Sequence, residues 1–151
     1  MQFATGAGRR LKDEYINAGK SVRLEYYHFT VVDTIVGGNE SRNAARAADC
    51  AAEQGRFWRY HDLLFANVQG EGVGSFRDAR LRAMAEAAGL NLSEFNACYD
   101  SGRTAASVDA DINRARTLGV TGTPTIFING QRVSADYNAI KAHIDQLLAS
   151  P

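Results

Sequence analysis

The chain of 151 residues lacks the features that mark several large classes of protein. It has no apolar run near the ~20 residues that span a bilayer, and it contains no repeat or low-complexity tract. Its seventeen Lys and Arg residues are matched by seventeen Asp and Glu residues, so no basic surface for phosphate contacts is expected. These absences predict a globular domain with no nucleic-acid partner and no membrane insertion by this chain.

Cysteine, proline and an export signal are also scarce or missing. The chain has two cysteines and two prolines, and it has no Cys-x-x-Cys motif. Residues 1–6 show neither the charged region nor the apolar region of a secretory signal. What is present, 45% hydrophobic and 23% charged residues, is typical of an ordered chain, and the length predicts a single domain over residues 1–151.

Hydrophobic periodicity predicts a helix and then a strand near the N-terminus. Residues 9–18 carry apolar side chains at helical spacing, and Gly19 supplies a stop signal. From residue 21 to 29, apolar and polar side chains alternate, which is the pattern of a half-buried strand.

The middle of the chain is predicted to hold four or five helices. The first is rich in alanine and has Asn39 or Ser41 as a candidate N-cap, and Ser75 is a candidate cap for a later helix. The last has an apolar face of Val108, Ile112, Ala115 and Leu118.

The clearest local prediction is a β-hairpin near the C-terminus. Residues 125–128 and 131–133 are strand-like, and the Asn129-Gly130 pair between them suits a two-residue type I′ turn. Ser134 or Asp136 then begins a final helix.

Pro124 stands at the entrance to this hairpin, where a proline costs a ladder hydrogen bond unless it lies at a strand's first residue or edge. A trans proline after a turn at Gly122 is one interpretation, because only about 5–6% of X–Pro bonds in folded proteins are cis. The Gly-Thr-Pro lead into a strand, followed by a hairpin and a C-terminal helix, resembles the cis-proline loop of the thioredoxin fold, and we therefore expect a cis bond.

Two long segments make the resemblance more specific. Residues 51–65 are similar to the helical insertion of DsbA-like thiol-disulfide oxidoreductases, and residues 118–130 are similar to that family's cis-proline loop and hairpin. The resemblance runs from about Phe3 to Leu148. It implies an α/β, thioredoxin-like fold with an all-helical insertion over about 38–118 and a thioredoxin core formed by 1–37 and 119–151.

Family members carry Cys-x-x-Cys at the N-terminus of the first helix, where the helix dipole lowers the thiol pKa. Aligned on residues 15–20, the family's spacing puts the second cysteine immediately before Met1. We therefore expect an N-terminally truncated fold that lacks the central first strand, with no catalytic residue in this chain. A rival alignment would place Thr5-Gly6-Ala7-Gly8 on the motif as a degenerate site, at the cost of about two turns of helix.

Three interpretations compete for Cys50 and Cys98: two buried free thiols, a metal site, and a structural disulfide. His28, His61 and His143 show no ligand spacing beside the cysteines, so no metal is expected. The resemblance favours the disulfide, since many exported relatives have cysteines at these two places. The chain-entropy model gives such a bond roughly 4 kcal/mol of stabilisation.

The histidines are not expected to be catalytic. His61 follows Trp58 on an aromatic helical face, where a packed core role is the simpler interpretation, and Trp58 is also predicted to be core. His28 ends the predicted strand, near the active-site end of this fold, but the Thr30-Val31-Val32 that follows departs from the Phe-Pro pattern common in relatives.

The resemblance implies thiol-disulfide exchange on protein or peptide substrates, with Thr123 and Pro124 as the remaining substrate-binding residues and with no cofactor. It implies an extracytoplasmic place for the complete protein, periplasmic, secreted or membrane-tethered. The unpaired strand edges also predict a possible oligomer. The alternatives are a non-catalytic peptide-binding module and a glutathione-dependent isomerase of the same fold. The isomerase uses a serine near the first helix, and no serine precedes Ser21.

Overall fold

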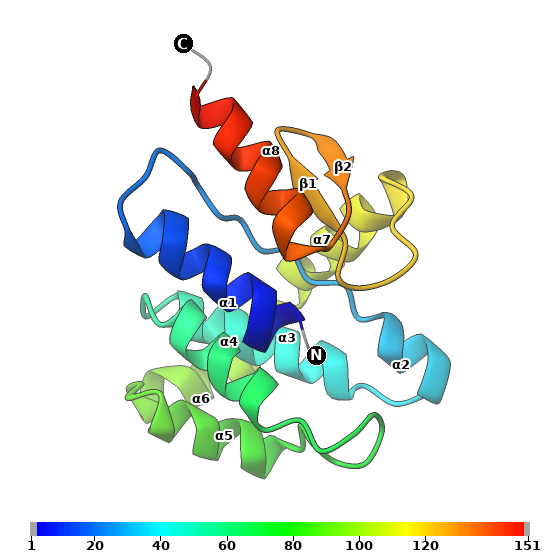
Figure 1. Ribbon diagram of the computed structural model, residues 1–151. Coiled ribbons are helices and arrows are strands. Elements are labelled where there is room, and N and C mark those ends of the chain that lie inside the picture. Colours follow the sequence, from blue (N-terminus) through cyan, green and yellow to red (C-terminus); the bar gives the residue numbers. More distant parts are fainter. Residues whose placement is uncertain (1–2, 150–151) are drawn as a thin grey trace. The chain divides into compact units, whose positions relative to one another are not determined.

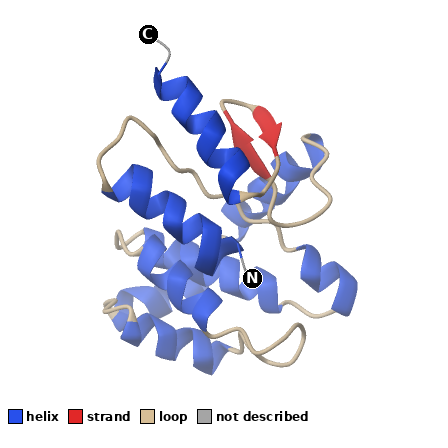
Figure 2. Cartoon of the chain, viewed as in Figure 1, coloured by secondary structure: helices blue, strands red, loops and turns tan. Residues whose placement is uncertain are grey.

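The computed structural model describes residues 3–149, which are mostly helical with one small sheet (Figure 2). Two π-helical segments, Phe3–Ala7 and Lys12–Asn17, flank α1. The other elements follow in chain order: α1 Gly8–Leu11, α2 Val31–Val36, α3 Glu40–Ala52, α4 Phe57–Ala66, α5 Asp78–Ala87, α6 Leu92–Ser101, α7 Ala105–Thr117, β1 Ile126–Ile128, β2 Gln131–Val133 and α8 Tyr137–Ala149.

The chain forms two compact units (Figure 1). Unit 1 contains residues 1–26 and 122–151, and unit 2 contains residues 27–121. The mostly helical content and the small sheet agree with the architecture that the resemblance implies.

Unit 2 is built around α3, which packs against α4, α5, α6 and α7. Its inward face consists of small residues, among them Ala47 and Ala51, which are fully buried and let neighbouring helices approach closely. Larger side chains fill the space between the helices, including Tyr60, Leu81 and Phe95, each 0% exposed. The Tyr60 hydroxyl donates to the Leu81 carbonyl at 2.9 Å, so its burial leaves no orphan polar group.

The start of α3 differs from the prediction. Neither Asn39 nor Ser41 caps the helix with its side chain; instead, the carboxylate of Asp33 on α2 accepts hydrogen bonds from the Ser41 and Arg42 N–H groups, at 2.9 and 2.8 Å. The helix α2, which residue spacing did not predict, supplies this carboxylate. Two of the N–H groups at the start of α3 that lack a partner within the helix are thus satisfied from the preceding helix.

The prediction that Ser75 caps a helix is also wrong. Ser75 is 0% exposed, and its hydroxyl accepts from the Gln69 N–H and donates to the Gly70 carbonyl. It therefore closes the loop before α5, while Arg77 occupies the N-cap position.

In unit 1 the three N-terminal helical segments form one continuous helix over residues 3–17, called the first helix, and its α1 part lies beside α8 (Figure 1). The buried Tyr15 hydroxyl donates to Asp145 Oδ1 at 2.6 Å, and Lys141 Nζ donates to the same hydroxyl at 3.3 Å and to Asp145 Oδ2 at 2.8 Å. Gly19, with φ +68°, ends the first helix as predicted.

The strand predicted over 21–29 does not form. Within residues 3–149 the sheet consists of β1 and β2 alone, and the segment after Gly19 forms no ladder. Leu24 and Tyr26, expected on a half-buried face, are 45% and 39% exposed. Alternation of side chains marks a chain that can be a strand, but the ladder needs a neighbouring strand, and the described residues offer none here.

The hairpin is confirmed. β1 and β2 pair antiparallel with Ile126 opposite Val133 and Ile128 opposite Gln131. The turn residues Asn129 and Gly130 have φ of +48° and +81°, which is the left-handed pair that a type I′ turn requires. At the start of α8, Asp136 accepts from the Ala139 N–H, so the second of the two candidate caps is the one used.

Candidate functional site

The loop that precedes β1 has the predicted backbone form. The Thr123–Pro124 peptide bond is cis, and both residues are exposed. Pro124 lies two residues before β1, outside the ladder, so its missing N–H costs no sheet hydrogen bond. The Thr125 hydroxyl donates to the Gly122 carbonyl at 2.7 Å, and this hydrogen bond stabilises the turn over residues 122–125.

This loop leads into a strand that is paired on one side. β1 forms its ladder with β2, and no second partner strand for β1 occurs among residues 3–149. An exposed loop that continues into a strand edge offers backbone N–H and C=O groups to an extended peptide. Thr123 and Pro124 stand at the accessible end of that edge.

Cys50 of α3 and Cys98 of α6 form a disulfide, with their Cα atoms 5.8 Å apart. This is the pairing expected from the resemblance. Each cysteine is 1% exposed, and Thr104 lies beside Cys50, with its Oγ1 3.9 Å from the sulfur. A bond so enclosed is shielded from attack by an external thiolate while the unit is folded.

His28 is buried and held on both its side chain and its backbone. Its Nε2 forms a hydrogen bond with Asp49 Oδ1 at 2.9 Å, and its backbone N–H donates to Asp111 Oδ2 at 2.9 Å. The neighbouring Tyr27 ring lies under the Arg114 guanidinium, 4.7 Å from its carbon to the ring centroid. These contacts fix the segment after residue 26 to α3 and α7.

His61 is 8% exposed and lies among aromatic rings on α4. The centroids of Trp58 and Phe65 are 5.3 and 4.7 Å from that of its imidazole. Its Nδ1 lies 3.0 Å from Asp62 Oδ1. The packed environment predicted for His61 is therefore present.

A polar network in unit 1 was missed at the sequence level. Burial and the hydrogen bond to Asp145 raise the pKa of the Tyr15 phenol. Hydrogen bonds from Lys141 and then Tyr15 hold the pKa of the Asp145 carboxyl below its usual value. Only the Lys141–Asp145 spacing of four residues is visible along the sequence, because the pairing with Tyr15 joins opposite ends of the chain.

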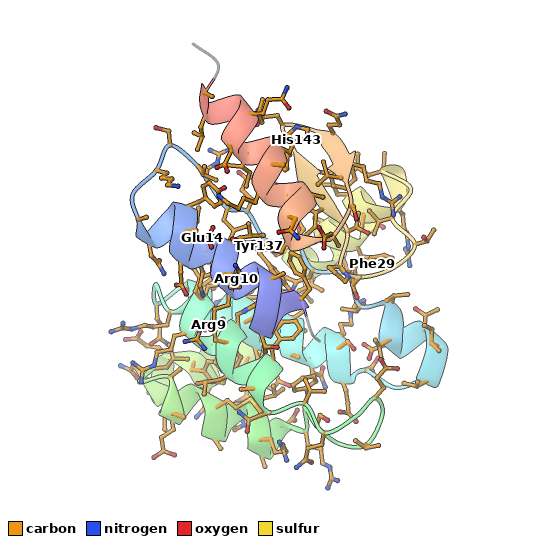
Figure 3. All side chains as sticks on the ribbon, in the orientation of Figure 1. Arg9, Arg10, Glu14, Phe29, Tyr137 and His143 are labelled. Atoms are coloured by element: carbon orange, nitrogen blue, oxygen red, sulfur yellow. A yellow bond between two sulfur atoms is a disulfide. The ribbon has the colours of Figure 1, made fainter. Side chains whose placement is uncertain are left out.

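A second set of polar contacts joins the first helix to the start of α8. The Tyr137 hydroxyl donates to Glu14, and the Arg10 guanidinium lies over the Tyr137 ring, 3.8 Å from its centroid. Figure 3 shows the three side chains close together. These contacts tie the N-terminal helical segment of unit 1 to α8.

The described part of the chain was compared with two further kinds of feature, a cluster of metal ligands and a membrane-spanning helix. No group of three or more His, Cys, Asp or Glu side chains among residues 3–149 is arranged to hold a metal ion. No helix in the same range combines the length and apolar character needed to cross a bilayer.

The family model described as Thioredoxin matches residues 1–146. The chain belongs to the thioredoxin family. A solved structure described as oxidised Mtb DsbA is similar over 83% of this chain and 65% of its own, with a TM-score of 0.66 and 28% identity. The DsbA-like character predicted from residues 51–65 and 118–130 is thereby confirmed.

Two curated relatives represent two kinds of protein. The Na(+)/H(+) antiporter NhaA 3 of Salinispora tropica is 38% identical over 132 residues, which are 86% of this chain and 19% of that protein. A probable disulfide bond formation protein D of Bacillus cereus is 27% identical over 143 residues, 92% of this chain and 63% of that protein. The chain spans less than two thirds of the length of either relative.

Proposed function

We propose that this chain is the substrate-binding body of a DsbA-like enzyme that exchanges disulfides with protein substrates. In that exchange a thiolate attacks one sulfur of a disulfide, a mixed disulfide forms, and the displaced sulfur leaves as a thiolate, so electrons are conserved. The chain's two cysteines are both used in the buried disulfide. The exchanging thiols would therefore come from Cys-x-x-Cys residues outside residues 1–151.

The observation that carries the proposal is the exposed cis-proline loop at the entrance to β1. Thr123 and Pro124 would hold the substrate backbone beside the attacking sulfur, as an extended peptide added to the strand edge. The Cys50–Cys98 bond would be structural, since its burial separates it from substrate thiols.

The remaining parts of the proposal concern the domain organisation, the cellular location and the self-association of the protein. The two units would form one thioredoxin domain, with residues of about 38–118 as its helical insertion. The complete protein would act outside the cytoplasm, where disulfides persist. The unpaired edges of unit 1 would favour self-association, which light scattering of the purified chain would detect as a mass above that of the monomer.

A peptide-binding module without thiol chemistry is the second candidate. Both cysteines of the chain are locked in a buried disulfide, and this observation favours it. Relatives in which the matched region is 19% of a Na(+)/H(+) antiporter also support the idea of a domain joined to a larger protein.

Insulin reduction by dithiothreitol, followed as turbidity, tests the two candidates. The chain as given should not accelerate the reaction. A form with an added strand and Cys-x-x-Cys ending immediately before Met1 should accelerate it, and the same extension with Ser-x-x-Ser should not.

Replacing Pro124 with Ala in the extended form should lower the rate, because Pro124 is proposed to hold the substrate backbone, while Asn138→Ala, an exposed change on α8, should leave it unchanged. An extended form that binds insulin but never accelerates its reduction would favour the module. Activity of the unextended chain would overturn the assignment of the thiols.

A further inference from the structure

Unit 2 contains two buried histidines that each form a hydrogen bond with an aspartate, and the two pairs differ in their access to water. His28 and His61 are 7% and 8% exposed. The side chain of Asp62, the partner of His61, is 54% exposed, whereas that of Asp49, the partner of His28, is 17% exposed. A pair that is largely removed from water is screened less than an exposed one, so the charge of the imidazole matters more at His28.

Contacts from three helices of unit 2 meet His28. Asp49 of α3 bonds the imidazole Nε2 at 2.9 Å, and Asp111 of α7 accepts from the backbone N–H at 2.9 Å. The Phe57 ring of α4 lies edge-on to the imidazole, with the centroids 6.1 Å apart, and it also contacts the ring of His61. The two charged groups among these direct contacts are both carboxylates.

Other charged groups near the pair have partners of their own. Arg114 of α7 lies over the ring of Tyr27, 4.7 Å from its centroid. One turn before Asp49 on α3, Arg46 donates to a backbone carbonyl of α6, and one turn after it, Glu53 pairs with an arginine of the loop that follows α6.

The second carboxylate oxygen of Asp49 is not satisfied in this arrangement. Asp49 Oδ2 is buried and has no hydrogen-bond partner among residues 3–149. In the described part of the chain, His28 is thus the group that supports this carboxylate. Burial disfavours an isolated charge, but two carboxylates beside a neutral imidazole leave an excess of negative charge, and a proton on the imidazole reduces it.

We propose that His28 and Asp49 form a pH-responsive clasp where the chain enters unit 2. Histidine changes its charge between about pH 5 and 8, when a proton from water adds to the ring. The imidazolium then donates a charge-assisted hydrogen bond to Asp49, and such bonds are about twice as strong as neutral ones. Residues 27 and 28 are therefore held to α3 and α7 more firmly at the acidic end of this range. The proposal does not rest on thiol exchange.

Hydrogen exchange of the whole chain tests the clasp, with rates corrected for their intrinsic pH dependence. The reporter is the His28 N–H, which Asp111 protects while the clasp is closed. Its protection should be about threefold or more higher near pH 5.5 than near pH 8, because the charged pair opens less often. Imidazole nitrogen shifts recorded over the same range should show that the change follows the charge of His28 and not that of His61.

Variants assign the effect to the pair. Asp49→Asn should abolish the pH dependence, because the amide oxygen still accepts a hydrogen bond but carries no charge. His28→Gln, which keeps a donor that does not titrate, should give equal protection at both pH values. Asp62→Asn, the matched change at the more exposed pair, should leave the dependence intact.

The proposal is overturned if the original chain protects the His28 N–H equally at both pH values, or more strongly near pH 8. It is also overturned if the dependence survives Asp49→Asn or is lost in Asp62→Asn. Both cysteines of the chain are bonded to each other, so these measurements involve no thiol, and their failure leaves the proposed thiol exchange untouched.

Discussion

The two units of this chain are stabilised by different means. In unit 2, buried alanines, aromatic rings and a disulfide form a continuous apolar core across α3 to α6. Among the described residues of unit 1, only Tyr15 and Ile140 are buried apolar side chains, and its first helix and α8 are joined mainly by hydrogen bonds and cation–π contacts. Unit 2 has the composition of a self-sufficient core, whereas unit 1 depends on polar contacts and on a sheet with one ladder.

The largest effect is expected from emptying the core of unit 2. Phe95→Ala should lower the free energy of unfolding by about 3–5 kcal/mol, because the ring is fully buried and its removal leaves a cavity between α4 and α6. Urea unfolding followed by the fluorescence of Trp58, the one tryptophan of the chain, measures it. Leu147→Ala, at a 41% exposed position of α8, is the control and should cost well under 1 kcal/mol. Equal effects of the two changes would contradict the contrast between the units.

Removing the disulfide should have the next largest effect. Replacing both Cys50 and Cys98 with Ala should cost about 2–4 kcal/mol, because the unfolded chain regains the freedom of a loop of 48 residues. Thermal unfolding with and without reductant measures it: the reductant should lower the midpoint of the original chain and leave that of the double variant unchanged. A midpoint for the original chain that does not respond to reductant after full reduction of the thiols would show that the bond is dispensable.

The sequence predicted local elements well where one segment contains its own signal. Asn129-Gly130 specifies the hairpin turn, and Asp136 caps α8, because both effects act within a few residues. The Cys50–Cys98 pairing followed from the family resemblance rather than from spacing.

The predictions from sequence fail where the structure of a segment depends on residues that are distant along the chain. No element was predicted over residues 31–36, yet α2 forms there, and its Asp33 accepts hydrogen bonds at the start of the next helix. The segment over 21–29 has the right alternation for a strand but no ladder in the described residues. For the candidate site, the cis-proline loop could be predicted, but the network of Tyr15, Lys141 and Asp145 could not, since it joins opposite ends of the chain.

The capping of α3 by Asp33 of α2 predicts a moderate effect on the stability of unit 2. Asp33→Ala should cost about 1–2 kcal/mol, because two N–H groups at the start of α3 lose their acceptor. Asn39→Ala, at the N-cap position itself, should cost less than about 0.5 kcal/mol, since its side chain makes no capping bond. Urea midpoints of the two variants compare them directly. A larger loss from Asn39→Ala would restore the capping predicted from the sequence.

The smallest effect is expected in unit 1, and it depends on pH. The pKa of the Asp145 carboxyl is lowered in the folded chain, first by the hydrogen bond from Lys141 and then by that from Tyr15. A carboxyl with a lowered folded pKa stabilises the fold above its unfolded pKa, near 3.8, and that stabilisation is lost as the pH falls through the folded pKa.

Hydrogen exchange, corrected for its intrinsic pH dependence, should therefore show the amides of α8 losing protection as the pH is lowered from 5 toward 3, with a smaller change in α3. Asp145→Asn should flatten this loss in α8, because the carboxyl that titrates is gone, while the exposed Glu86→Gln on α5 should not. If α8 and α3 lose protection together in every variant, the two units unfold as one, and the polar network of unit 1 contributes no separate stability.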